Sequence, residues 1–106
     1  MGRNILITNP TLHPKAKETL EKLGFQVWIA QDPSEDALID LINQKQIIGM
    51  FVRIEKITGK IFDSCPTLQI VVENGIGVDN IDVEAATRNG VKVANLSLGA
   101  LAVAEH

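Results

Sequence analysis

Short apolar runs alternate with amphipathic stretches along the chain. Five runs rich in aliphatic and β-branched residues span 4–8, 25–30, 47–52, 68–72 and 91–95. Three of these runs show little polar alternation, which is typical of strands covered on both faces. Four stretches with helical spacing lie near 13–23, 33–45, 59–64 and 82–89. In the first of them Ala16, Leu20 and Leu23 share one face, which we expect to pack on the sheet.

Residues at the ends of the helical stretches support these boundaries. Asp32, Pro33 and Glu35 indicate an N-cap, a first helical residue and an acidic residue in the first turn. Gly24 and Gly90 each stand between a helix and a strand, where glycine readily takes a positive φ angle at the helix exit.

The strict alternation of strands and helices predicts an α/β domain with right-handed crossovers and a parallel sheet. Five strands favour the flavodoxin-like order 2-1-3-4-5, with helices on both faces of the sheet. The length of 106 residues suits one such domain.

Composition excludes several classes of protein. The net charge is -3 and the basic residues are scattered, so no nucleic-acid-binding patch is expected. No apolar stretch approaches the roughly 20 residues of a membrane span. Cys65 is the single cysteine, and the start of the chain does not resemble a signal peptide, so we expect a cytoplasmic protein. No spacing of residues is typical of a metal site.

The sequence "ENGIGVDN" follows the fourth predicted strand, at the edge of a parallel sheet where ligands gather. Its Gly75 and Gly77 fit a dinucleotide fingerprint poorly, because Asn80 stands where the third glycine is needed. The two glycines either permit a simple turn or let main-chain N–H groups bind an anion such as a carboxylate.

Arg53 follows the third predicted strand and lies at the same edge. Its planar guanidinium suits a carboxylate ligand, whereas the alternative is a surface ion pair with Glu55 or Glu73. The loop after the first strand lacks the hydroxyl groups of an FMN site and the acidic residues of a phospho-receiver domain.

Three segments, "FVRIEKIT", "CPTLQIVVENGIGVDNIDVEAATRNGVKVAN" and "VAEH", resemble the D-isomer-specific 2-hydroxyacid dehydrogenases, and the phosphoglycerate dehydrogenase-like members most. The resemblance implies a flavodoxin-like substrate domain over 1–98 and the start of an interdomain helix over 99–106. It further implies that the substrate carboxylate is bound at Gly75, Ile76 and Gly77, with Arg53 near the acidic end of the substrate. Ile54 stands where the family often has serine, and Glu73 where a basic residue is common.

The catalytic arginine, the acid–base histidine and the G-x-G-x-x-G loop of such enzymes lie further downstream. The resemblance therefore implies a fragment without catalytic, cofactor-binding or metal-binding residues, inactive by itself, whose NAD-binding domain is absent from this chain. The parent is expected to be a homodimer that uses NAD or NADP on a 2-keto or 2-hydroxy acid. The alternative is a non-enzymatic small-ligand or regulatory domain with the same fold.

Overall fold

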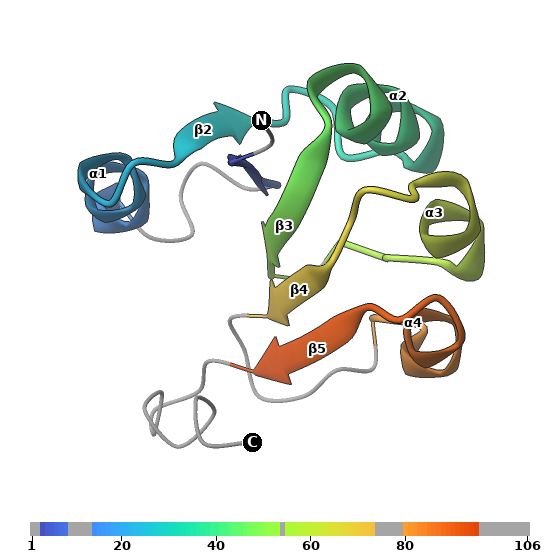
Figure 1. Ribbon diagram of the computed structural model, residues 1–106. Coiled ribbons are helices and arrows are strands. Elements are labelled where there is room, and N and C mark those ends of the chain that lie inside the picture. The colour runs from blue at the N-terminus through green and yellow to red at the C-terminus, as the bar shows by residue number, and fades with distance from the viewer. Residues whose placement is uncertain (1–2, 9–13, 54, 74–79, 96–106) are drawn as a thin grey trace.

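A single parallel sheet with helices on both faces makes up the computed structural model, which describes residues 3–8, 14–53, 55–73 and 80–95 (Figure 1). The elements are β1 (Asn4–Ile7), α1 (Pro14–Lys22), β2 (Gln26–Ile29), α2 (Glu35–Lys45), β3 (Ile47–Val52), α3 (Gly59–Ser64), β4 (Ile70–Glu73), α4 (Val83–Arg88) and β5 (Lys92–Asn95). The strand order is β2-β1-β3-β4-β5, and α2, α3 and α4 lie on one face with α1 opposite (Figure 1). The predicted fold class, strand order and two-sided covering are confirmed.

The main core lies between the sheet and the three helices on one face. Its largest fully buried side chains come from β1, α2, β3, α3 and β4 and include Leu6, Leu38, Ile42, Met50, Val52, Ile61, Phe62 and Val71. On the other face, Ile7 and Val27 form a smaller cluster against Leu20 of α1. Because the central strands are buried on both faces, their sequences show no polar alternation.

The predicted start of the second helix is wrong by two residues. Ser34 occupies the N-cap position and α2 begins at Glu35. The Asp32 carboxylate instead accepts a hydrogen bond from the main-chain N–H of Ser34 at 2.9 Å, within a turn that precedes the helix. The helix exits are as predicted, since Gly24 and Gly90 have φ angles of 96° and 73°.

Leu23 is a second correction, because it was expected to pack on the sheet and is 62% exposed. It lies one residue beyond the end of α1, where the chain turns at Gly24 and carries the side chain away from the sheet. Leu20 packs as predicted, and the side chain of Ala16 lies outside the described part of the structure.

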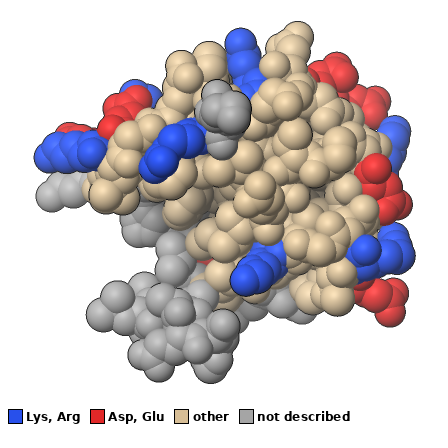
Figure 2. Space-filling view, in the orientation of Figure 1, with Lys and Arg blue, Asp and Glu red and all other residues tan. Residues whose placement is uncertain are grey.

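Acidic and basic side chains alternate on the side of the molecule formed by α2, α3 and α4 (Figure 2). Lys60 Nζ lies 3.2 Å from Asp36 Oδ1, and Arg88 Nη2 lies 3.6 Å from Asp63 Oδ1. Such mixing of charges is typical of a solvated surface. None of the helices within the described ranges has the length and apolar composition needed to cross a bilayer.

Candidate functional site

The ends of β1, β3 and β4 lie next to one another at the carboxyl edge of the sheet. Val52 at the end of β3 is aligned with Glu73 at the end of β4, and Glu73 is aligned with Asn95 of β5. On the other side of β3, the main-chain N–H of Thr8 donates to the carbonyl oxygen of Phe51 at 3.0 Å. This is the edge at which the sequence predicts a ligand.

Glu55 is held in a fixed orientation at this edge. Its Oε1 accepts a hydrogen bond from the main-chain N–H of Arg53 at 3.0 Å and lies 2.6 Å from Thr8 Oγ1. Thr8 is only 3% exposed, and its hydroxyl also lies 3.1 Å from the Phe51 carbonyl oxygen. The Thr8 hydroxyl donates its proton to Glu55 Oε1, because this contact is the shorter one and its acceptor is a carboxylate. Glu55 thereby ties the loop after β3 to the end of β1.

Arg53 is exposed at the same edge, directly after β3. Among the residues that the structure describes, its guanidinium forms no ion pair, so the alternative role as a partner of Glu55 or Glu73 is not observed. Arg53 donates a hydrogen bond to the Glu55 carboxylate through its main-chain N–H. The guanidinium is therefore available to a ligand, and its predicted contact with substrate stays a prediction.

Asn80 connects the loop after β4 to the loop after β3. Its side-chain Nδ2 donates to the carbonyl oxygens of Glu55 at 2.8 Å and Arg53 at 3.4 Å. The main chain adds two hydrogen bonds, from Ile57 N–H to the Asn80 carbonyl at 2.8 Å and from Asp82 N–H to the Ile57 carbonyl at 2.9 Å. In the sequence, Asn80 stands out only as the position that lacks the third glycine of a fingerprint, and this role was not predicted.

The predicted carboxylate-binding residues Gly75, Ile76 and Gly77 lie outside the described residues, as does Ile54. The residues that flank the glycine segment are described. Glu73 ends β4 and is 3% exposed, and Asn80 is bonded to the loop after β3. Both flanks lie at the carboxyl edge, which is the location that the prediction requires of the segment between them.

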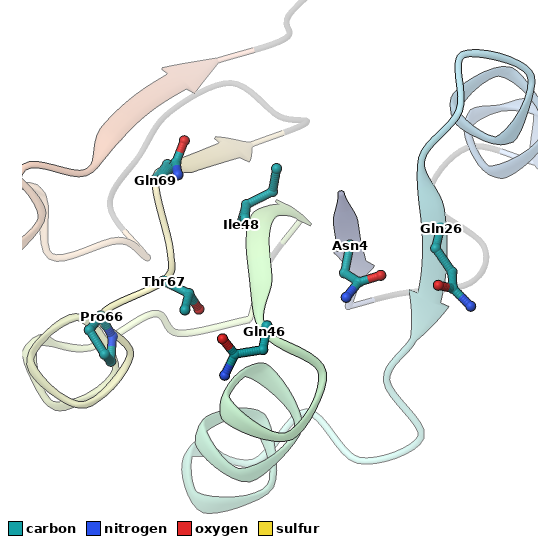
Figure 3. Close-up of a pocket in the computed structure, with 7 residues that line it drawn as sticks. All are labelled: Asn4, Gln26, Gln46, Ile48, Pro66, Thr67 and Gln69. Atoms are coloured by element: carbon teal, nitrogen blue, oxygen red, sulfur yellow. The ribbon is translucent and has the colours of Figure 1, made fainter. Parts of the chain in front are cut away.

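A hollow of about 670 Å³ lies at the opposite edge of the sheet (Figure 3). It is lined by residues at the amino ends of the strands and in the preceding loops, namely Asn4, Gln26, Gln46, Ile48, Pro66, Thr67 and Gln69. None of these residues carries a charge. Several polar groups already bond the main chain, as Thr67 Oγ1 does to the Ile47 carbonyl oxygen at 2.9 Å. The hollow therefore offers a carboxylate no balancing charge.

Neither a reactive thiol nor a cluster of metal ligands is found in the described part of the chain. Cys65 is 1% exposed, and burial raises the pKa of its thiol to about 11, which disfavours the nucleophilic thiolate. No group of three or more histidine, cysteine, aspartate or glutamate side chains there could hold a metal ion.

Comparison with known proteins agrees with this geometry. Residues 5–106 match the family model of the D-isomer specific 2-hydroxyacid dehydrogenase catalytic domain. The chain therefore belongs to this family, and the resemblance noted in the sequence is confirmed.

Two relatives and one solved structure illustrate the similarity. D-3-phosphoglycerate dehydrogenase of Sus scrofa is 38% identical over 98 residues, which are 92% of this chain and 18% of the relative. Glyoxylate reductase of Thermococcus onnurineus is 32% identical over 96 residues, or 90% of this chain and 28% of the relative. The crystal structure of NAD+-bound 3-phosphoglycerate dehydrogenase from Entamoeba histolytica has a TM-score of 0.77 at 28% identity, covering 87% of this chain and 32% of that one. This chain thus spans less than a third of the length of each.

Proposed function

We propose that this chain is the N-terminal part of the substrate domain of an NAD(P)-dependent D-2-hydroxyacid dehydrogenase. The full-length protein would reversibly reduce 2-keto acids, with this chain binding the substrate carboxylate. The observation that supports the proposal most is the joining of the loops after β3 and β4 by Asn80, which keeps Arg53 and both flanks of 74–79 at one edge.

In this proposal the main-chain N–H groups of Ile76 and Gly77 donate to the carboxylate. Gly75 and Gly77 leave room for the anion to approach the main chain, because neither residue has a Cβ. The guanidinium of Arg53 faces the same anion or the far end of the substrate. Closure of the full-length protein over the substrate would also keep water from the reacting carbon.

The residues of this chain do not fit a dinucleotide. Asn80 stands where the third glycine of the fingerprint is needed, and its side chain is bonded to the Glu55 carbonyl at 2.8 Å. The helix that follows has only six residues. We therefore assign NAD or NADP to a separate nucleotide-binding domain of the full-length protein and expect the 106-residue chain alone to be inactive. A homodimer stays an expectation from the family.

The proposal is tested by Gly77→Ala and Arg53→Lys in the full-length protein. Alanine at 77 crowds the bound anion, and lysine at 53 keeps the charge but loses the planar fork. Losing charge-assisted hydrogen bonds costs about 1.5–3 kcal/mol, so kcat/KM for 2-keto acids should fall about ten- to a hundredfold. The measurements are steady-state kinetics together with the thermal midpoint of each variant.

Two matched variants separate binding from folding. Gly90→Ala introduces a Cβ at a glycine outside the proposed site, and Arg88→Lys changes another exposed arginine, which pairs with Asp63. Both should keep the wild-type kcat/KM. Wild-type kinetics in Gly77→Ala and Arg53→Lys would contradict the proposed site, and would leave Gly75 and Gly77 as a simple turn. A full-length protein without turnover of any 2-keto acid would favour the regulatory-domain alternative.

A further inference from the structure

An asparagine followed by a glycine lies at the exit of α4, where the chain turns into β5. Asn89 and Gly90 are both exposed, and Gly90 has a φ angle of 73°. Among the described residues, no atom lies within 4 Å of the point where a Cβ would stand on Gly90. The main-chain nitrogen of Gly90 is therefore not shielded by a side chain on that residue. Of the residues that can follow asparagine, glycine hinders an attack of this nitrogen on the side-chain amide least.

The reaction open to this pair is deamidation. The main-chain nitrogen of Gly90 loses its proton and forms a bond to Cγ of Asn89. The bond from Cγ to Nδ2 breaks at the same carbon, and Nδ2 takes up a proton and leaves as ammonia. Water then opens the succinimide ring at one of its two carbonyl carbons, so an aspartate or an isoaspartate remains. Water is the second reactant, and neither an oxidant nor a reductant is needed.

Hydrogen bonds restrain both reacting groups in the folded protein. Asn89 Nδ2 donates to Asp63 Oδ1 at 2.8 Å and to the Ala85 carbonyl oxygen at 2.9 Å. The main-chain N–H of Gly90 donates to the Thr87 carbonyl oxygen at 3.0 Å. The nitrogen must give up the proton that it donates, and Cγ must turn toward it, before the ring can close. The native hydrogen bonds therefore slow the reaction.

The restraint depends on the contact between α3 and α4, which lie side by side (Figure 1). Asp63 belongs to α3, and its Oδ1 also lies 3.6 Å from Arg88 Nη2 at the end of α4. The helix α4 has only six residues. So short a helix is marginal without its packing partner, and it opens locally at a lower free energy than the buried strands. Opening of α4 releases the side chain of Asn89.

We propose that Asn89–Gly90 is a latent site of spontaneous deamidation, which the hydrogen bond from Asn89 to Asp63 protects while α4 is packed on α3. The product has a carboxylate at this position, and a carboxylate accepts hydrogen bonds but donates none. Next to Asp63 it repels where the amide was attracted, so the packing of α4 on α3 weakens. Since the modification is irreversible, molecules in which α4 has opened accumulate as a less stable form. The inference does not depend on the proposed function.

The test follows deamidation of Asn89 in the full-length protein by peptide mass spectrometry during incubation in a mildly alkaline buffer. In the wild type, the rate in buffer should be about tenfold or more below the rate in urea, where the protecting hydrogen bonds are lost. Asp63→Ala removes the acceptor and should raise the rate in buffer about tenfold. In urea the variant and the wild type should react equally fast.

A conservative variant separates the hydrogen bond from the ion pair. Asp63→Asn retains an oxygen that accepts from Asn89 but removes the charge that pairs with Arg88, so its rate in buffer should stay close to that of wild type. Asn43 is an internal control, because it is also exposed and donates to the Ser64 carbonyl oxygen at 3.0 Å. The residue that follows Asn43 is a glutamine, whose side chain hinders the attack, so Asn43 should stay unmodified.

Three results would overturn the inference: equal wild-type rates in buffer and in urea, an unchanged rate in Asp63→Ala, or a rate in Asp63→Asn as high as in Asp63→Ala. Absence of deamidation at Asn89 in urea would do the same. If Asp63→Ala does not fold, the wild-type comparison and Asp63→Asn still decide. The sequence has a second asparagine–glycine pair at 74–75, outside the described residues, and it is quantified on its own peptide.

Discussion

Asn80 shows how one side chain can hold two loops of the candidate site together. Its amide donates to the carbonyl oxygens of Arg53 and Glu55, and its own carbonyl accepts from Ile57. An amide is suited to this position because it supplies two donors without a charge. A carboxylate of the same size would face two carbonyl oxygens and could donate to neither.

Asn80→Ala should therefore lower the stability of the protein by about 1 kcal/mol and also raise KM for the 2-keto acid, because the loop after β3 loses its attachment. Asn80→Asp should be at least as destabilising at neutral pH, since it places a negative charge against the two carbonyl oxygens. The stability of both variants is measured by urea denaturation, and their KM by steady-state kinetics at 25 °C. A KM and a denaturation midpoint equal to those of wild type would show that Asn80 has no such role.

Residue type alone indicated Arg53 as a candidate ligand-binding residue. It did not indicate the hydrogen bonds that Glu55 and Asn80 form at the same edge. An arginine directly after a buried strand is conspicuous in a sequence, since burial of its charge is costly. The contacts of Glu55 join it to Thr8, 47 positions away, and those of Asn80 join it to Arg53, 27 positions away. Such contacts depend on which strands are neighbours in the sheet, and local sequence carries no direct sign of them.

At the level of helices and strands, the apolar runs predicted each element and its type. The fourth strand begins at Ile70 rather than at residue 68. The main-chain N–H of Leu68 donates to the Cys65 carbonyl oxygen in a turn, and the first hydrogen bond to β3 comes from the N–H of Gln69. Asp32 misled the helix prediction in a similar way. In both cases an apolar or capping residue is used by a turn just before the element, and periodicity does not detect this.

The short helix α4 depends on its cap. Asp82 Oδ1 accepts a hydrogen bond from the main-chain N–H of Ala85 at 3.0 Å, and the helix has six residues in total. Asp82→Ala should destabilise the protein by about 1 kcal/mol. Asp82→Asn retains an acceptor of the same length and should lose only a few tenths of a kcal/mol. Denaturant midpoints give the comparison, and equal midpoints for the two variants would rule out a stabilising cap.

At the scale of the whole molecule, the strand order was predicted from the flavodoxin-like arrangement of five alternating strands and helices. The order β2-β1-β3-β4-β5 places the carboxyl ends of β1, β3 and β4 next to one another at one edge. The sequence could therefore predict which edge of the sheet carries the proposed site, and the family match is to the D-isomer specific 2-hydroxyacid dehydrogenase catalytic domain. The hydrogen bonds of Glu55 and Asn80 at that edge required the structure.

The most direct test of the central claim is a crystal structure of the full-length protein with NADH and oxamate, an analogue of a 2-keto acid. We expect the oxamate carboxylate to lie within about 3.2 Å of the main-chain nitrogens of Ile76 and Gly77, with the Arg53 guanidinium facing the ligand. Oxamate bound elsewhere in the protein, with no contact to Gly75, Ile76 or Gly77, would contradict it.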